Sequence, residues 1–99
     1  MASYRINVTE EAKADLSHYN VFERKLVVSE IRKQLTNEPL IETKNRKSLR
    51  DNPIAAWELR IDKYRVFYEV KEAAGMVSIV SVGHKEHNVL FVRGKELEI

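Results

Sequence analysis

Between residues 2 and 8 every second residue is apolar, and polar residues stand between them. This period of two predicts a half-buried strand over 2–8. Thr9 follows at the position of a helix N-cap, and the two acidic residues after it suit the positive end of a helix dipole. We therefore expect a short helix over 10–18.

A longer helix is expected over 21–36. Asn20 is a favoured N-cap residue, and Glu23, three positions later, completes a capping-box pattern. Apolar residues recur at helical spacing along one face, at Val27, Val28, Ile31 and Leu35. Phe22 and Leu26 lie on another side of this helix, where we expect them to meet the first helix.

The second half of the chain returns to a period of two. After a polar loop over 38–52, apolar and polar residues alternate over 57–61 and again over 64–70. Residues 76–82 are mostly apolar and follow another short turn. Three strands joined by short turns predict an antiparallel meander. The pattern over 84–99 is compatible with a terminal hairpin.

The order of strand, two helices and three to four strands predicts an α+β fold, with both helices packed on one side of the sheet. The first strand is expected at an edge or in the middle of that sheet. A length of 99 residues, 43% of them hydrophobic and 32% charged, fits a single globular domain over 1–99. The absence of cysteine excludes a disulfide scaffold, cysteine-bound metals and thiol catalysis. No apolar run approaches the roughly 18 residues of a membrane span, and no apolar signal core opens the chain, so we expect a cytoplasmic protein.

The positive charge of the chain is concentrated in one stretch. Residues 44–65 carry seven basic and three acidic side chains, whereas the segments before and after them each carry one more acidic than basic residue. Such a cluster suits a polyanionic partner, and nucleic acid is the usual one. A solvated, lysine-rich loop is the alternative interpretation.

Two arginines flank the predicted turn between the first two strands of the meander. Arg60 and Arg65 both stand at the polar phase of their strands, where two guanidinium groups can form a phosphate clamp. The alternative is cross-strand pairing with Glu58, Asp62 or Glu69, which is common on exposed sheet faces.

The segment from His84 to His87 follows the third strand of the meander, and we expect it to be a loop. It offers a cation, a carboxylate and two imidazoles, which are groups that transfer protons near pH 7. The two histidines are three residues apart, but no third metal ligand is evident, so we predict neither a metal nor a cofactor. A polar surface loop is an equally simple interpretation.

The sequence over 56–70, with its Leu-Arg-x-x-x-Tyr-Arg-Val-x-Tyr pattern, and the Val-Gly pair within 80–86 resemble the RelE/ParE superfamily. Members of this superfamily are the toxins of bacterial type II toxin–antitoxin pairs. The resemblance covers nearly the whole chain, because the expected order of elements also matches. It does not separate the RelE branch from the ParE branch.

The RelE branch implies an endoribonuclease that cleaves mRNA in the ribosomal A site without metal and so inhibits translation. There the 2′-hydroxyl attacks the adjacent phosphate, and basic side chains position it and stabilise the developing charge. Arg65 matches the arginine at the scissile phosphate, and Arg60 and Lys85 match further basic positions. The part of the family that lies on ribosomal RNA corresponds here to four basic residues: Lys44, Arg46, Lys47 and Arg50.

Two positions depart from the family pattern. Glu58 stands where the family has a basic residue, and Phe91 stands where it often has a tyrosine. Some RelE relatives combine phenylalanine there with a histidine four residues earlier, which is His87 in this chain. The resemblance then implies that His87 protonates the leaving 5′-oxygen while Phe91 stacks on a base.

Two alternatives stay open on the same resemblance. A ParE-like toxin would inhibit DNA gyrase, and a decayed member would keep only the ability to bind an antitoxin. In every case we expect an antitoxin partner, which contacts the helices and an exposed sheet edge and carries acidic residues facing 44–65. The RelE interpretation adds the ribosome and mRNA as partners, and no interpretation involves a membrane or a small-molecule cofactor.

Overall fold

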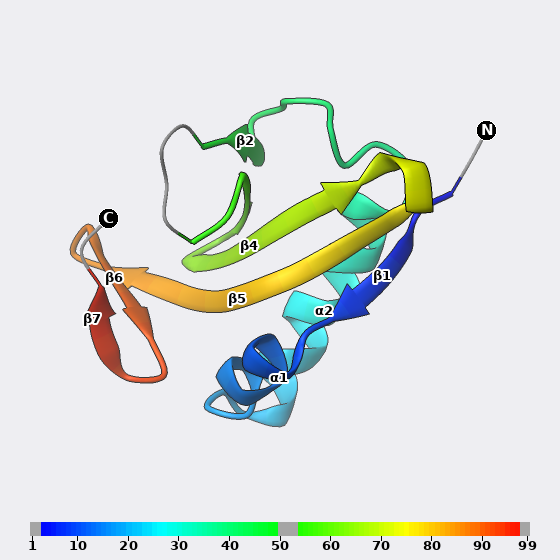
Figure 1. Cartoon of the computed structure of the whole chain (residues 1–99). Coiled ribbons are helices and arrows are strands. Elements are labelled where there is room, and N and C mark those ends of the chain that lie inside the picture. Colours follow the sequence, from blue (N-terminus) through cyan, green and yellow to red (C-terminus); the bar gives the residue numbers. More distant parts are fainter. Residues whose placement is uncertain (1–2, 50–53, 98–99) are drawn as a thin grey trace.

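The computed structural model describes residues 3–49 and 54–97 and confirms the α+β class (Figure 1). Its elements follow the chain in this order: β1 (Arg5–Val8), α1 (Glu10–Leu16), α2 (Val21–Leu35), β2 (Arg46–Ser48), β3 (Trp57–Ile61), β4 (Tyr64–Lys71), a 3₁₀ turn (Glu72–Ala74), β5 (Met76–Glu86), β6 (Val89–Val92) and β7 (Lys95–Leu97). Within these ranges no helix is both long and apolar enough to cross a bilayer.

Both helices begin at the residues that the sequence indicates. The Thr9 hydroxyl accepts a hydrogen bond from the backbone N–H of Ala12 at 3.2 Å. Asn20 and Glu23 form the expected capping box, in which each side chain accepts from the other residue's backbone N–H. These bonds satisfy donors that would otherwise have no partner in the first turn.

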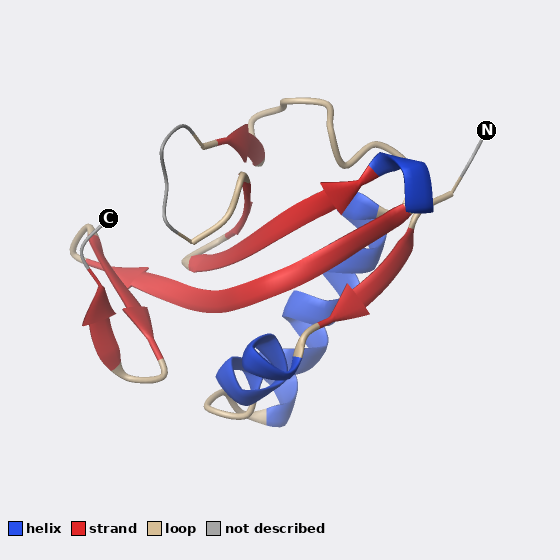
Figure 2. Ribbon diagram, in the orientation of Figure 1, coloured by secondary structure: helices blue, strands red, loops and turns tan. Residues whose placement is uncertain are grey.

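The predicted meander is confirmed, and β5 is its longest strand (Figure 2). Strands β2, β3, β4 and β5 are consecutive antiparallel neighbours. The other edge of β5 is shared: β1 pairs in parallel with its first part, and β6 pairs antiparallel with its last part. β6 and β7 form the terminal hairpin.

Two expectations about this sheet are wrong. The segment 38–52 is not all loop, because β2 pairs with β3 inside it. The segment from His84 to Glu86 is strand rather than loop, because β6 turns back and supplies the ladder partners that extend β5. Only His87 and Asn88, both with positive φ, form the turn between β5 and β6.

The main core lies between the two helices and one face of the sheet, as Figure 1 shows. From α2 it receives Val27, Ile31 and Leu35, all at most 1% exposed. The expectation that Phe22 and Leu26 pack against the first helix is wrong, since these side chains are 77% and 37% exposed. The start of α2 therefore presents apolar surface to solvent.

The opposite face of the sheet, which we call the open face, carries a smaller apolar cluster. Ala55, Phe67 and Leu90 are buried there. β6 approaches β5 so closely that a Cβ atom on Gly83 would lie 2.5 Å from the carbonyl oxygen of Phe91. Glycine is therefore required at this point by backbone proximity, not by backbone conformation.

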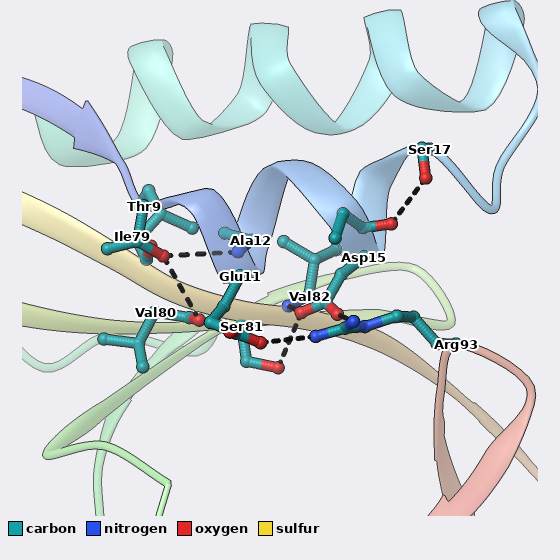
Figure 3. A network of polar contacts seen from close by, with 11 residues as sticks. Thr9, Glu11, Ala12, Asp15, Ser17, Ile79, Val80, Ser81, Val82 and Arg93 are labelled. Atoms are coloured by element: carbon teal, nitrogen blue, oxygen red, sulfur yellow. Dashed lines mark hydrogen bonds and ion pairs between the residues drawn. The ribbon is translucent and has the colours of Figure 1, made fainter.

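A buried carboxylate joins α1, β5 and the terminal hairpin (Figure 3). Asp15 is 1% exposed and accepts hydrogen bonds from the Ser81 hydroxyl and the Val82 backbone N–H, each at 2.9 Å. Its other oxygen accepts from Nε of Arg93 at 2.6 Å, and Arg93 also contacts Glu11. The Val82 N–H belongs to the part of the β5 edge that lies between β1 and β6.

Replacing Asp15 by alanine should lower the free energy of unfolding by about 3 kcal/mol, because it leaves the Val82 N–H without an acceptor and Arg93 without its buried partner. Urea denaturation measures this change. Glu11→Ala is the matched control, since it removes an exposed carboxylate from the same arginine and should cost much less. Equal losses for the two variants would contradict the assignment.

Candidate functional site on the open face of the sheet

Arg60 and Arg65 lie side by side on the open face. They are direct register partners in the β3–β4 ladder, so their side chains leave the sheet on the same face. The flanking residues Leu59, Ile61 and Tyr64 belong to the core on the helix side, which fixes the arginines to the opposite side. The β3–β4 hairpin thus builds the pair that the spacing predicted.

The guanidinium of Arg65 is only partly used within the protein. One terminal nitrogen donates to the carbonyl oxygens of Asp62 and Tyr64, at 2.7 and 2.9 Å. Its Nε is buried and has no hydrogen-bond partner. Burial lowers the pKa of Arg65 from its ordinary value, Glu58 opposes that shift, and Arg60 adds to it. A buried donor without a partner favours binding of an anion that supplies the acceptor.

Further charged residues surround this pair. Gly83 is the register partner of Arg65, and Lys85, two residues later in β5, lies on the same face. On the other side, Lys47 of β2 is the register partner of Glu58. The open face therefore carries four basic side chains around one carboxylate, in the order Lys47, Glu58 and Arg60, Arg65, Lys85 across neighbouring strands.

The predicted RNA-binding residues divide into different environments. Lys44 is exposed and Lys47 is half-buried, and both remain candidates. Arg46 departs from the expectation: it is 8% exposed, and its guanidinium donates to the carbonyl oxygens of Gln34 and Ile41. It pairs in register with Leu59 and so points to the helix side, where its charge stabilises the C-terminal end of α2. Arg50 lies outside the described residues.

The remaining two predicted site residues do not join the arginines. His87 is exposed in the turn after β5. Phe91 is the register partner of His84, and the two rings stack with centroids 5.7 Å apart. Because His84 in turn pairs with Tyr64 of the helix-side core, Phe91 lies on the face away from Arg60 and Arg65.

An aromatic and imidazole cluster on the helix side was not predicted from the sequence. The Tyr19 hydroxyl is 2.7 Å from Nδ1 of His84, and Nε2 of His84 is 3.3 Å from Glu86. The Tyr64 hydroxyl donates to Glu23, which also belongs to the capping box of α2. Burial, followed by the effects of Glu23, raises the pKa of Tyr64 to about 12. These contacts tie β4 and β5 to both helices.

A sequence signal for part of this cluster exists. His84 and Tyr64 stand at the apolar phase of their strands, where a polar atom needs an internal partner. The partners come from the distant positions 19 and 23, which no local pattern links to the strands.

A family model described as the ParE toxin of type II toxin–antitoxin systems, parDE, matches residues 6–89. The chain belongs to this toxin family. No curated protein sequence matches the toxin significantly.

Solved structures show the same fold for the toxin. A chain of the RelBE2 toxin–antitoxin complex from Mycobacterium tuberculosis has a TM-score of 0.75 and 27% identity, over 86% of the toxin and 94% of that chain. The isolated RelE toxin of E. coli has a TM-score of 0.62 and 22% identity, over 85% and 86% of the two chains. A chain of the intact E. coli RelBE complex has a TM-score of 0.60 and 24% identity, over 85% and 99%. The toxin is therefore a member of the RelE/ParE superfamily with a RelE-like fold.

The Glu23 carboxylate makes the stability of the toxin depend on pH. The hydrogen bond from Tyr64, and then the one from the Asn20 backbone, lower the pKa of Glu23 in the folded state. A lowered folded-state pKa means that its stabilisation is complete above the ordinary carboxylate range and is lost as the pH falls through the folded value. We expect Glu23→Gln to reduce the loss of stability on acidification from about pH 5 downwards.

Urea midpoints between pH 3 and pH 7 measure this effect. Glu30→Gln, which changes an α2 carboxylate outside the capping box, is the control and should leave the pH dependence unchanged. Parallel pH curves for the wild type and Glu23→Gln would contradict the assignment.

Proposed function

We propose that this toxin inhibits translation as an endoribonuclease that cleaves mRNA on the ribosome. The observation that carries the proposal is the adjacent pair Arg60 and Arg65 on the open face, with a buried and unpartnered Nε on Arg65. Guanidinium groups in this arrangement suit a phosphate, because they offer several donors in a fixed plane. The structural likeness to RelE toxins supports the same branch of the superfamily.

In the proposed reaction the 2′-oxygen forms a bond to the adjacent phosphorus, and the bond from that phosphorus to the 5′-oxygen of the next nucleotide breaks. The 2′-hydroxyl loses its proton, and the leaving 5′-oxygen gains one. Arg65 binds the scissile phosphate, with Arg60 and Lys85 beside it, so that the charge developing on the phosphate oxygens is stabilised. His87, in the exposed turn, is proposed to supply the proton.

Phe91 fits this proposal less directly. Its ring stacks on His84 on the helix side, so a base reaches the other face of the ring only if the RNA passes around the end of β5 and β6. We therefore assign the chemistry to the open face and its adjoining turn, and base stacking to Phe91 as a separate contact.

Inhibition of DNA gyrase is the second candidate function. It is favoured by the same separation of Phe91 from the arginines and by Glu58, which places a negative charge among the basic side chains. The matching family model is also described by the ParE branch. The two candidates differ in their target, so one induction experiment separates them.

Inducing the toxin alone in a bacterium should arrest growth and produce new mRNA 5′ ends within codons. Arg65→Ala should reduce cleavage by about 100-fold or more, because it removes the principal phosphate ligand. Mapping of mRNA 5′ ends measures this change. Arg5→Ala is the matched control, since Arg5 pairs with the opposite end of β5. Growth arrest with DNA damage and without new 5′ ends would replace the proposal by gyrase inhibition, and no arrest would indicate a decayed site.

We also propose that an antitoxin helix binds a groove along α2. The groove has apolar walls from Leu16 and Val28 and is bordered by four basic side chains: Arg24, Lys25, Arg32 and Lys33. An amphipathic helix with acidic flanks is complementary to this surface. The RelBE2 and RelBE structures are themselves toxin–antitoxin complexes, which supports such a partner here.

Reversing two charges of the groove, Lys25→Glu with Arg32→Glu, should weaken antitoxin binding roughly tenfold or more, because like charges then face each other. Calorimetric titration of the toxin with its antitoxin measures the affinity. Lys71→Glu, at the end of β4, is the control for a simple change of net charge. Unchanged affinity in the double variant would exclude the groove as the antitoxin site.

A further inference from the structure

Glu58 is an unusual residue for its position on the open face. Its side chain is only 5% exposed, although neighbouring Arg60 is 45% exposed. A carboxylate is removed from water at a considerable cost unless a cation and hydrogen bonds compensate. The compensation comes from Arg60, whose Nε donates to Oε2 of Glu58 at 2.8 Å.

This contact orients the Arg60 guanidinium. Because Nε is bound to Glu58, the two terminal nitrogens point away from the carboxylate, and neither has a partner among the described residues. A guanidinium held in this way offers its terminal edge, which can bind two oxygens of one phosphate.

The same carboxylate reduces repulsion within the arginine pair. Arg60 and Arg65 are direct register partners, and like charges in that position destabilise a sheet. Other charged groups reach Glu58 from the neighbouring strands: Lys47 on β2 is its register partner, and Glu69 lies further along β4, where it accepts from the Ala56 backbone N–H. Glu58 is thus the carboxylate that directly contacts the arginine pair.

We propose that Glu58 is a positioning residue, whose buried carboxylate holds the Arg60 guanidinium beside Arg65 in the orientation that binds the scissile phosphate. This inference rests on the proposed ribonuclease function. It gives the acidic residue at a normally basic position a role that acts through Arg60, not on the RNA itself.

The test compares single-turnover cleavage of ribosome-bound mRNA by the wild type and by variants. Glu58→Ala should slow cleavage by about 100-fold, as expected when a phosphate ligand is misplaced by about 1 Å. Glu58→Gln should retain an intermediate rate, because its amide oxygen still accepts from Arg60 Nε. Glu69→Gln is the matched control on the same face and should cleave at the wild-type rate.

Two further readouts separate positioning from other roles. Glu58→Ala combined with Arg60→Ala should be no slower than Arg60→Ala alone, because Glu58 then has nothing to position. The Arg60 Nε–H resonance in ¹⁵N NMR should shift in Glu58→Ala without any change at residues of the helix-side core. A general shift of the spectrum would show a structural role and overturn the proposal.

The remaining outcomes are also decisive. Wild-type cleavage by Glu58→Ala would overturn the positioning role while leaving the ribonuclease function intact. Loss of the acidic limb of the pH–rate profile in Glu58→Gln, with additive effects in the double variant, would make Glu58 the base that accepts the 2′-hydroxyl proton and overturn the proposal. Absence of cleavage by the wild type would instead refute the proposed function on which the inference rests.

Discussion

The shared edge of β5 is the constraint on which the rest of the structure depends. β1 and β6 both pair with this edge, and backbone groups between them lack a strand neighbour. Asp15 supplies the missing acceptor by binding the Val82 N–H, and its second oxygen binds Arg93 at the hairpin turn. One carboxylate therefore completes the sheet, attaches α1 and fixes the hairpin. Since β6 extends β5 to Glu86, the positions of Lys85 and His87 follow from this contact.

The two faces of the sheet divide the work between stability and recognition. The helix side holds the large core and the hydrogen-bonded ring cluster, in which Tyr19 binds His84 and Tyr64 binds Glu23. The open face has a small apolar cluster and keeps its basic side chains at the edge of that cluster. Cations held on a rigid sheet need little reorganisation to meet a phosphate, which suits catalysis by electrostatics.

The sequence predicted those features that depend on local chemistry. Both helix caps and the β3–β4–β5 meander follow from residues close in the chain, and so does the pairing of Arg60 with Arg65 across a tight turn. Features that depend on distant segments were missed. β2 forms only because β3 accepts it as a neighbour, and β5 continues past Val82 only because β6 returns beside it. The burial of Arg46 likewise depends on the end of α2, which lies far from it in sequence.

The position of Phe91 shows why a family pattern alone does not define a site. Matching by sequence spacing places Phe91 with Lys85 and His87, and it takes no account of which face each residue occupies. Once 84–86 is strand, the period of two separates Lys85 from His84, and register then places Phe91 with His84. The turn at His87 lies between these faces. An RNA strand that contacts both Arg65 and Phe91 must therefore bend around this turn, and the histidine lies where the bend brings the backbone closest to the protein.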